Sequence, residues 1–227
     1  SLWFAVNAVM PDLQRELGWP AAAVGTLTSG LQFGFIVGTL VFALLAIADR
    51  FSARRVFLLC SLAGAACTVG AWAMVRDYSA LLVWRFATGF FLAGIYPVGM
   101  KIAAQWYTRG LGGALGLLIG ALVLGSASAH ALRALGNALP WPTLMLGVAG
   151  LAAAGGLLLF LGTTDAPGAQ ARVTTLQWRA LATVWTDARV RSSVLAYFGH
   201  MWELYTMWVM VPLVLTTRVQ GLALSWA

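Results

Sequence analysis

Three ionisable side chains lie inside long apolar stretches of the sequence, and they are the first candidates for chemistry. Arg85 comes a few residues into one stretch, and His200 and Glu203 lie in another. If these stretches cross a bilayer, each charge is costly, and an ionisable residue in a span is by default a functional candidate. We therefore treat Arg85, His200 and Glu203 as candidates for substrate binding or proton coupling.

The densest polar cluster is the segment 197–208, which reads YFGHMWELYTMW. His200, Glu203 and Met207 fall at i, i+3 and i+7, so they share one helical face, which Tyr197 borders. A His and a carboxylate one turn apart can relay a proton, as a proton-coupled carrier needs. The alternative is a neutral hydrogen-bonded pair that fixes helix packing. Two ligands are too few for a closed metal site, so we expect no metal.

Arg85 and Gln32 each allow two interpretations. The Arg85 guanidinium stays charged at any relevant pH, so it is either an anion-binding or proton-coupling charge in a central cavity or a structural side chain that reaches the headgroups. Gln32 either faces the cavity and hydrogen bonds the solute or joins two helices.

The composition indicates that all of these residues belong to a polytopic membrane protein. Hydrophobic residues make up 61% of the 227 residues and charged ones 9%, against about 45–50% and 25% in soluble domains. Spans of about 20 apolar residues cross a bilayer as helices. We expect them at residues 2–10 (the end of a first span), 21–48, 56–75, 79–104, 112–132, 143–162 and 192–215.

The expected fold is an all-α helical bundle with about six to seven transmembrane helices. Residues 1–163 form a six-helix bundle whose first helix is truncated, and 192–227 are the truncated first helix of a second bundle. Residues 164–191 are a cytoplasmic linker, in which Leu181, Val184, Trp185 and Ala188 recur at the spacing of an amphipathic surface helix. Both ends of the chain lie in or near apolar sequence, so we expect a fragment of a longer protein.

The net charge is +7, and the distribution of the basic residues predicts an orientation. With loop 48–55 in the cytoplasm, nine of the fourteen Lys and Arg residues lie on that side and four on the other, as the positive-inside rule requires. Nucleic-acid binding is disfavoured because no basic patch is interleaved with aromatic residues. The compact loops favour a bacterial inner membrane.

Loop 45–55, LAIADRFSARR, resembles the loop between helices two and three of the major facilitator superfamily, whose pattern is roughly G-x-L-a-D-r-x-G-r-R. The matching residues are Asp49, Arg50, Arg54 and Arg55. The departures are Leu45 for Gly, Ser52 for the second Gly and Ala53 for a basic residue.

Two further segments resemble the same family. Residues 85–97, RFATGFFLAGIYP, are similar to its R-x-x-x-G…P stretch on helix four, and 109–125 are similar to its glycine-rich helix five. Gly125 is followed by Ser126 rather than Pro, which counts against an antiporter. The resemblance covers about residues 1–215. It implies two six-helix halves, alternating access and a solute site near the midplane between them.

The resemblance also implies a gating role for Asp49, Arg50, Arg54 and Arg55. A carboxylate at a cytoplasmic helix end can pair with a nearby Arg or a helix N-terminus, and such a latch favours the outward-open state. The alternative is an ordinary interfacial ion pair of Asp49 with Arg50 or Arg54, which contributes little.

Nucleotide, hydrolase and metalloprotease motifs are not found, so we expect no enzyme and no cofactor. The first hypothesis is a secondary active transporter or facilitator of a small solute, by proton symport, and Arg85 favours an anionic substrate. Its partners would be the solute, a proton or other coupling ion and the lipid bilayer, with the carrier a monomer. A non-transporting membrane sensor or assembly factor on a carrier-like fold is the alternative, and an intramembrane enzyme is a third.

Overall fold

A computed structural model describes residues 2–20, 22–107, 109–135, 140–165 and 185–225. Within these ranges, the side chains at 128–135, 205 and 208–225 lie outside the description. The chain divides into two compact units, Ser1–Thr174 and Thr175–Ala227, and each is described by itself. Helices are the regular elements throughout the described ranges, and no strand occurs there, which confirms the expected all-α class.

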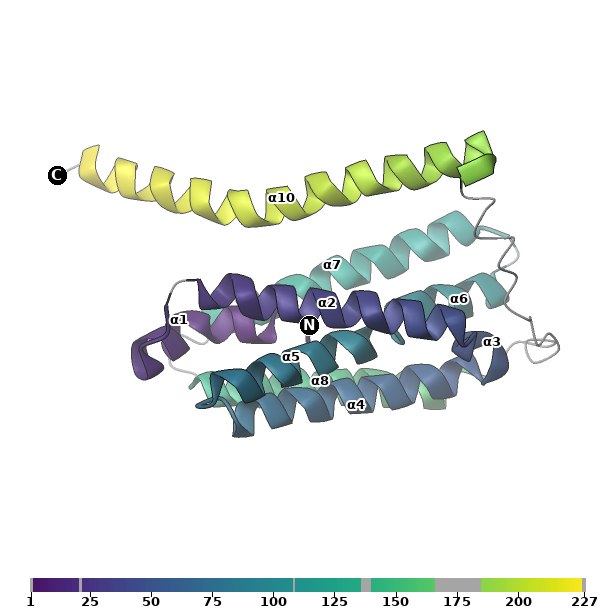
Figure 1. Cartoon of the computed structure of the whole chain (residues 1–227), viewed down its shortest axis with the longest axis horizontal. Helices are drawn as coiled ribbons and strands as arrows, with labels where there is room; N and C mark the ends of the chain where they lie inside the picture. Colours follow the sequence, from purple (N-terminus) through teal and green to yellow (C-terminus); the bar gives the residue numbers. More distant parts are fainter. Residues whose placement is uncertain (1, 21, 108, 136–139, 166–184, 226–227) are drawn as a thin grey trace. The chain divides into compact units, whose positions relative to one another are not determined.

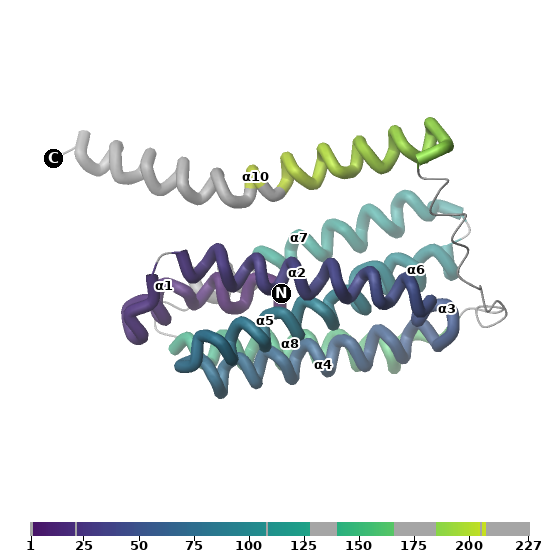
Figure 2. Tube along the Cα trace, in the orientation of Figure 1, coloured from purple at the N-terminus to yellow at the C-terminus, as the bar shows by residue number. Residues whose placement is uncertain are grey.

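The first unit is a bundle of helices that run alongside one another (Figure 1). α2 packs on α5, and α4 packs on both α5 and α8. The helices are α1 (Ala5–Leu17), α2 (Ala23–Leu44), α3 (Ile47–Arg50), α4 (Ala53–Ala73), α5 (Tyr78–Leu92), α6 (Tyr96–Trp106), α7 (Leu111–Leu135) and α8 (Trp141–Gly162). Figure 2 follows the same course of the chain from α1 to α8.

Several helices are long and apolar enough to cross a membrane. Among the described residues these are Ala23–Leu44, Ala53–Ala73, Tyr78–Trp106 and Trp141–Gly162, and Leu111–Ala127 is a shorter apolar helix. Each falls in a stretch where the sequence predicts a span.

The first helix is longer than predicted. Residues 11–20 were expected to be a polar connection, but α1 continues through Pro11 and ends at Leu17. Leu13 is fully buried, and the burial of this apolar side chain stabilises the longer helix. The polar residues around Leu13 in the sequence had suggested a loop. Gly18 then ends the helix in the left-handed conformation, φ 68°, and its N–H donates to the Gln14 carbonyl at 3.0 Å.

The span expected at 79–104 is broken at residues 93–95, between α5 and α6. Pro97 lies in the first turn of α6. It has no N–H to donate, and in a continuous helix its ring would clash with the carbonyl of Ala93. Proline therefore ends one helix and begins the next inside a single apolar stretch.

Close packing occupies the break. A Cβ at Gly94 would collide with the Cys60 sulfur and approach the Phe42 ring to 2.7 Å, so only glycine fits there. The Gly94 amide donates to the Phe91 carbonyl at 3.0 Å, which keeps the interrupted backbone hydrogen bonded in an apolar setting.

The tight helix contact in this unit lies between α2 and α5. A Cβ at Gly34 or at Gly89 would collide with a backbone carbonyl of the facing helix, and one at Gly38 would lie 2.5 Å from the Phe90 carbonyl. Small residues at four-residue spacing allow helix backbones to touch in lipid. Gly112, Gly116 and Gly120 of α7 have the same spacing, but a Cβ at any of these three positions meets nothing within 4 Å.

The second unit consists, in its described part, of a short helical turn at 185–186 and α10 (Ala188–Ser225). The Asp187 carboxylate accepts from the amide of Arg189 at 2.8 Å and caps the start of α10. The span expected at 192–215 lies within this helix. Leu181 and Val184 of the expected amphipathic helix lie outside the described residues, and Trp185 is exposed.

Candidate functional site

Arg85 lies in the core of the first unit with 1% of its surface exposed. Eight residues separate it from the N-cap Asp77, or about 12 Å along the helix axis. Its side chain is directed inward to the turn before α1, where Nη1 donates to the Leu2 carbonyl at 3.2 Å and Nη2 to the Trp3 carbonyl at 2.8 Å. The side chain therefore lies inside the bundle.

The charge of Arg85 is not compensated by any described residue. Its partners are neutral carbonyl groups, and its buried Nε–H has no acceptor among the residues that the structure describes. The ion pairs in that part of the chain involve other residues. A buried charge without a counter-charge is unfavourable unless dipoles or a ligand stabilise it. Arg85 thus combines a full positive charge with an unused donor.

A polar contact joins α1 and α2. Asn7 Nδ2 donates to Thr28 Oγ1 at 3.0 Å, and that hydroxyl donates to the Val24 carbonyl at 2.7 Å. Gln32 lies one turn after Thr28 and is half-buried. Sequence reasoning singled out Gln32 but missed Asn7, although an amide in an apolar stretch is the same kind of signal. Hydrogen-bonding groups are therefore present on both helices.

The loop before α4 is tied to α6. Lys101 of α6 donates to the Asp49 carboxylate and to the Ala48 carbonyl. Asp49 was expected to pair with an Arg or a helix N-terminus, and Lys101 was not considered as its partner. The structure instead pairs these two residues. Arg50 is exposed next to Asp49 and forms no ion pair with a described residue.

The start of α4 is tied to the C-terminal end of α8. Arg54 Nε lies 3.4 Å from Asp165 Oδ2, and its Nη1 donates to the Thr163 carbonyl at 3.0 Å. Ser52 donates to the same Asp165 carboxylate at 2.6 Å. A cation is favourable at the carbonyl end of a helix. Arg55 is exposed, and sequence reasoning missed both Ser52 and Asp165.

The candidates on α10 are exposed within their own unit. His200, Glu203 and the 59%-exposed Tyr197 all lie on the described part of this helix. His200 and Glu203 form no hydrogen bond with each other or with any other described residue. The hydrogen-bonded pair that would fix packing is therefore not formed in the described part of the chain.

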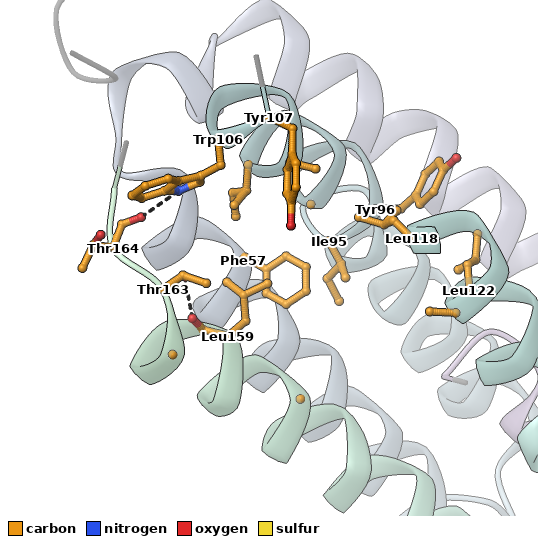
Figure 3. A pocket seen from close by; sticks show the side chains of 16 residues that line it. Phe57, Ile95, Tyr96, Trp106, Tyr107, Leu118, Leu122, Leu159, Thr163 and Thr164 are labelled. Atoms are coloured by element: carbon orange, nitrogen blue, oxygen red, sulfur yellow. Dashed lines mark hydrogen bonds between the residues drawn. The ribbon is translucent and has the colours of Figure 1, made fainter. Parts of the chain in front are cut away.

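A separate cavity of about 960 Å³ lies among α4, α6, α7 and α8 (Figure 3). It was not anticipated, and none of the candidate residues discussed above for binding, coupling or gating lines it. The lining residues are Phe57, Ile95, Tyr96, Gly99, Ile102, Ala103, Trp106, Tyr107, Leu118, Ala121, Leu122, Gly155, Leu159, Gly162, Thr163 and Thr164.

Long apolar helices around a buried cation define a polytopic helical membrane protein. The family model of the Major Facilitator Superfamily matches residues 1–227. The chain therefore belongs to the major facilitator superfamily, whose members are membrane transporters rather than enzymes, and the resemblance inferred from loop 45–55 is confirmed. No curated protein and no solved structure matches the chain.

Proposed function

We propose that this chain is part of a secondary carrier that moves a small anionic solute by alternating access, coupled to protons. The family membership supplies the coarse function, a transporter of small solutes in a membrane. The observation that carries the anionic specificity is the buried Arg85, whose charge faces neutral carbonyls and whose Nε–H has no acceptor among the described residues.

The argument for an anion is one of charge balance. A guanidinium presents five donors in a planar fork that matches a carboxylate or phosphate group. Burial makes such a charge expensive, and an anion from the solute would compensate it during transport. Asn7, Thr28 and Gln32 on α1 and α2 would then supply neutral hydrogen bonds to the rest of the solute.

The argument for proton coupling rests on Glu203. The chain has seven Asp and Glu residues, and Glu203 is the one that lies inside an expected span. A carboxyl group in a span binds and releases a proton at lower cost than it carries a permanent charge. His200 shares its helical face and Tyr197 borders that face, so they would relay the proton to it.

The remaining parts of the proposal concern gating and setting. The Asp49–Lys101 pair would hold the cytoplasmic ends of α3 and α6 together in the outward-open state, with Arg50, Arg54 and Arg55 around it. The carrier would act as a monomer in a bacterial inner membrane, since the distribution of bases follows the positive-inside rule.

The test is uptake by the full-length protein in liposomes, with matched anionic and neutral solutes of similar size. We expect uptake of a small carboxylate or inorganic anion. The external medium should become more alkaline, because protons enter the vesicle with the anion. Arg85→Gln should lower anion uptake by roughly 10- to 100-fold, since one hydrogen bond to a charged group contributes about 1.5–3 kcal/mol. Glu203→Gln should retain exchange but abolish proton movement.

Arg76→Gln is the matched control, because Arg76 is exposed in the turn before α5. It should transport normally. If the protein takes up neutral solutes and Arg85→Gln leaves that uptake unchanged, the anionic specificity is refuted. A protein that transports none of the solutes but is correctly folded would favour the sensor alternative.

A further inference from the structure

The cavity among α4, α6, α7 and α8 is separate from the proposed solute site. Its volume of about 960 Å³ lies within the range of small-molecule sites. Its walls are apolar, and they include Phe57 of α4, Ile95 before α6, Leu118 of α7 and Leu159 of α8 (Figure 3). An apolar cavity of this kind in a membrane protein is filled by hydrocarbon rather than by water.

Polar groups gather at one end of this cavity. Trp106 Nε1 donates to the Thr164 carbonyl at 3.2 Å. The Tyr107 hydroxyl points toward the Phe57 ring, inside the cavity (Figure 3). Tyr107 is 53% exposed, and its hydroxyl bonds no described residue. Trp and Tyr at a helix end are typical of the headgroup level of a bilayer.

The same end is positively charged. Arg54 donates to the carbonyl of Thr163, which lines the cavity, but it also pairs with Asp165. Arg109 is exposed two residues after Tyr107 and pairs with no described acidic residue. The positive-inside rule predicts that this end faces the cytoplasm, where the leaflet attracts basic residues through its anionic lipids.

We propose that this cavity is a binding site for an anionic phospholipid of the cytoplasmic leaflet. One acyl chain lies among the apolar walls, and the headgroup phosphate lies at the rim, where the chain leaves α6 after Trp106 and continues toward Arg109. Charge complementarity selects the anionic lipid: the apolar walls accept any acyl chain, whereas an exposed Arg without an acidic partner favours a phosphate that carries a net negative charge.

Two glycines of α8 provide a matched pair of variants. Gly155 lines the cavity, Gly150 does not, and a Cβ at either position meets nothing within 4 Å. Gly155→Leu therefore adds a side chain at the cavity wall whose Cβ is clear of every neighbour. Gly150→Leu makes the same chemical change on the same helix outside the cavity.

The experiment measures lipid retention by the purified full-length carrier with native mass spectrometry. The detergent-solubilised protein is titrated with phosphatidylglycerol or with phosphatidylcholine of the same acyl chains. We expect one tightly retained phosphatidylglycerol per protein and weaker retention of phosphatidylcholine. Gly155→Leu should weaken phosphatidylglycerol retention about tenfold, whereas Gly150→Leu should leave it unchanged.

The charge is tested separately. Arg109→Gln should reduce the preference for phosphatidylglycerol about fivefold, which corresponds to about 1 kcal/mol for one basic residue near the membrane surface. Arg76→Gln, at the opposite end of the bundle, should not change the preference. Melting temperatures confirm that each variant is folded.

Three results would overturn the proposal. The first is equal retention of phosphatidylglycerol by Gly155→Leu and the wild type, and the second is equal retention of the two lipids by the wild type. The third is a wild type that retains no lipid, as expected if another part of the full protein covers the cavity. Lipid mass is read independently of transport, so failure here leaves the carrier function untouched and the converse also holds.

Discussion

Two regions of the first unit stabilise positive charge in opposite ways. At the end that carries loop 45–55, Lys101 pairs with Asp49 and Arg54 pairs with Asp165, and these four side chains are between 20% and 48% exposed. In the core, Arg85 is 1% exposed and has only backbone carbonyls as partners among the described residues.

The difference indicates what each charge is for. An exposed ion pair contributes about 0–1 kcal/mol, so it orients loops at little cost and breaks easily. A buried cation without a counter-ion is costly, so replacing it by an apolar side chain removes a desolvation penalty. We infer that Arg85 binds the solute, whereas the Asp49–Lys101 and Arg54–Asp165 pairs determine which conformation of the carrier is favoured.

The largest predicted effect separates function from stability at Arg85. Arg85→Met should reduce anion transport at least 100-fold, because it removes the charge that compensates the solute. Its free energy of unfolding should stay within about 2 kcal/mol of the wild type, because relief from a buried charge offsets the carbonyls that lose a partner. Transport in liposomes and thermal unfolding in detergent measure the two quantities. A variant that loses transport only because it unfolds would contradict the comparison.

A permanent carboxylate beside Arg85 should have the next largest effect. Thr88 lies three residues along α5 and is also buried, so Thr88→Asp places a carboxylate on the same helical face. This internal counter-ion should compete with the solute and weaken anion binding about tenfold. Thr88→Asn, which has the same shape without the charge, is the control. Equal affinity in the two variants would show that charge compensation is not the basis of binding.

Breaking the Asp49–Lys101 pair should have a smaller effect, on the balance between the outward-open and inward-open conformations. Asp49→Asn removes the partner of Lys101, and loss of an exposed pair shifts an equilibrium by up to about fivefold. We expect a larger inward-open population, measured by labelling of a cysteine introduced on the cytoplasmic side of the solute pathway. The exchange Asp49→Lys with Lys101→Asp should restore the wild-type population. An unchanged population in Asp49→Asn would remove the latch.

The smallest effect concerns salt. Asp165→Asn should destabilise the protein by less than about 1 kcal/mol, because the Arg54–Asp165 pair is partly exposed. The difference from the wild type should shrink in 1 M salt, where the Debye length falls to about 3 Å. Any change in unfolding temperature that Arg85→Met causes should be the same at low and high salt, because a buried charge is screened little. Unfolding temperatures at low and high salt compare the two.

Local sequence predicted much of this architecture and little of its tertiary contacts. Apolar length predicted α2, α4 and α8, because lipid requires about 20 apolar residues per span. It failed at Leu13, whose burial extends α1 past Pro11, and at Pro97, where a break lies inside a continuous apolar stretch. In both places packing or backbone chemistry outweighs hydropathy.

Residue type singled out the candidates for the site but did not predict their partners. Arg85 was recognisable as a charge in a span, yet its partners Leu2 and Trp3 are 82–83 residues away in sequence. Lys101 is likewise 52 residues from Asp49. Contacts across such separations depend on how helices are arranged, which the spacing of residues within one helix does not encode. The Gly34–Gly38 spacing on α2, in contrast, was available from the sequence and was overlooked.

The most direct test of the central claim is equilibrium binding of a small anion to the purified full-length carrier. Calorimetry should compare that anion with a neutral isostere, in the wild type and in Arg85→Met. The account predicts that the wild type binds the anion at least tenfold more tightly than the isostere and that Arg85→Met abolishes the difference. Equal binding of the anion by both proteins would show that the buried guanidinium does not recognise the solute.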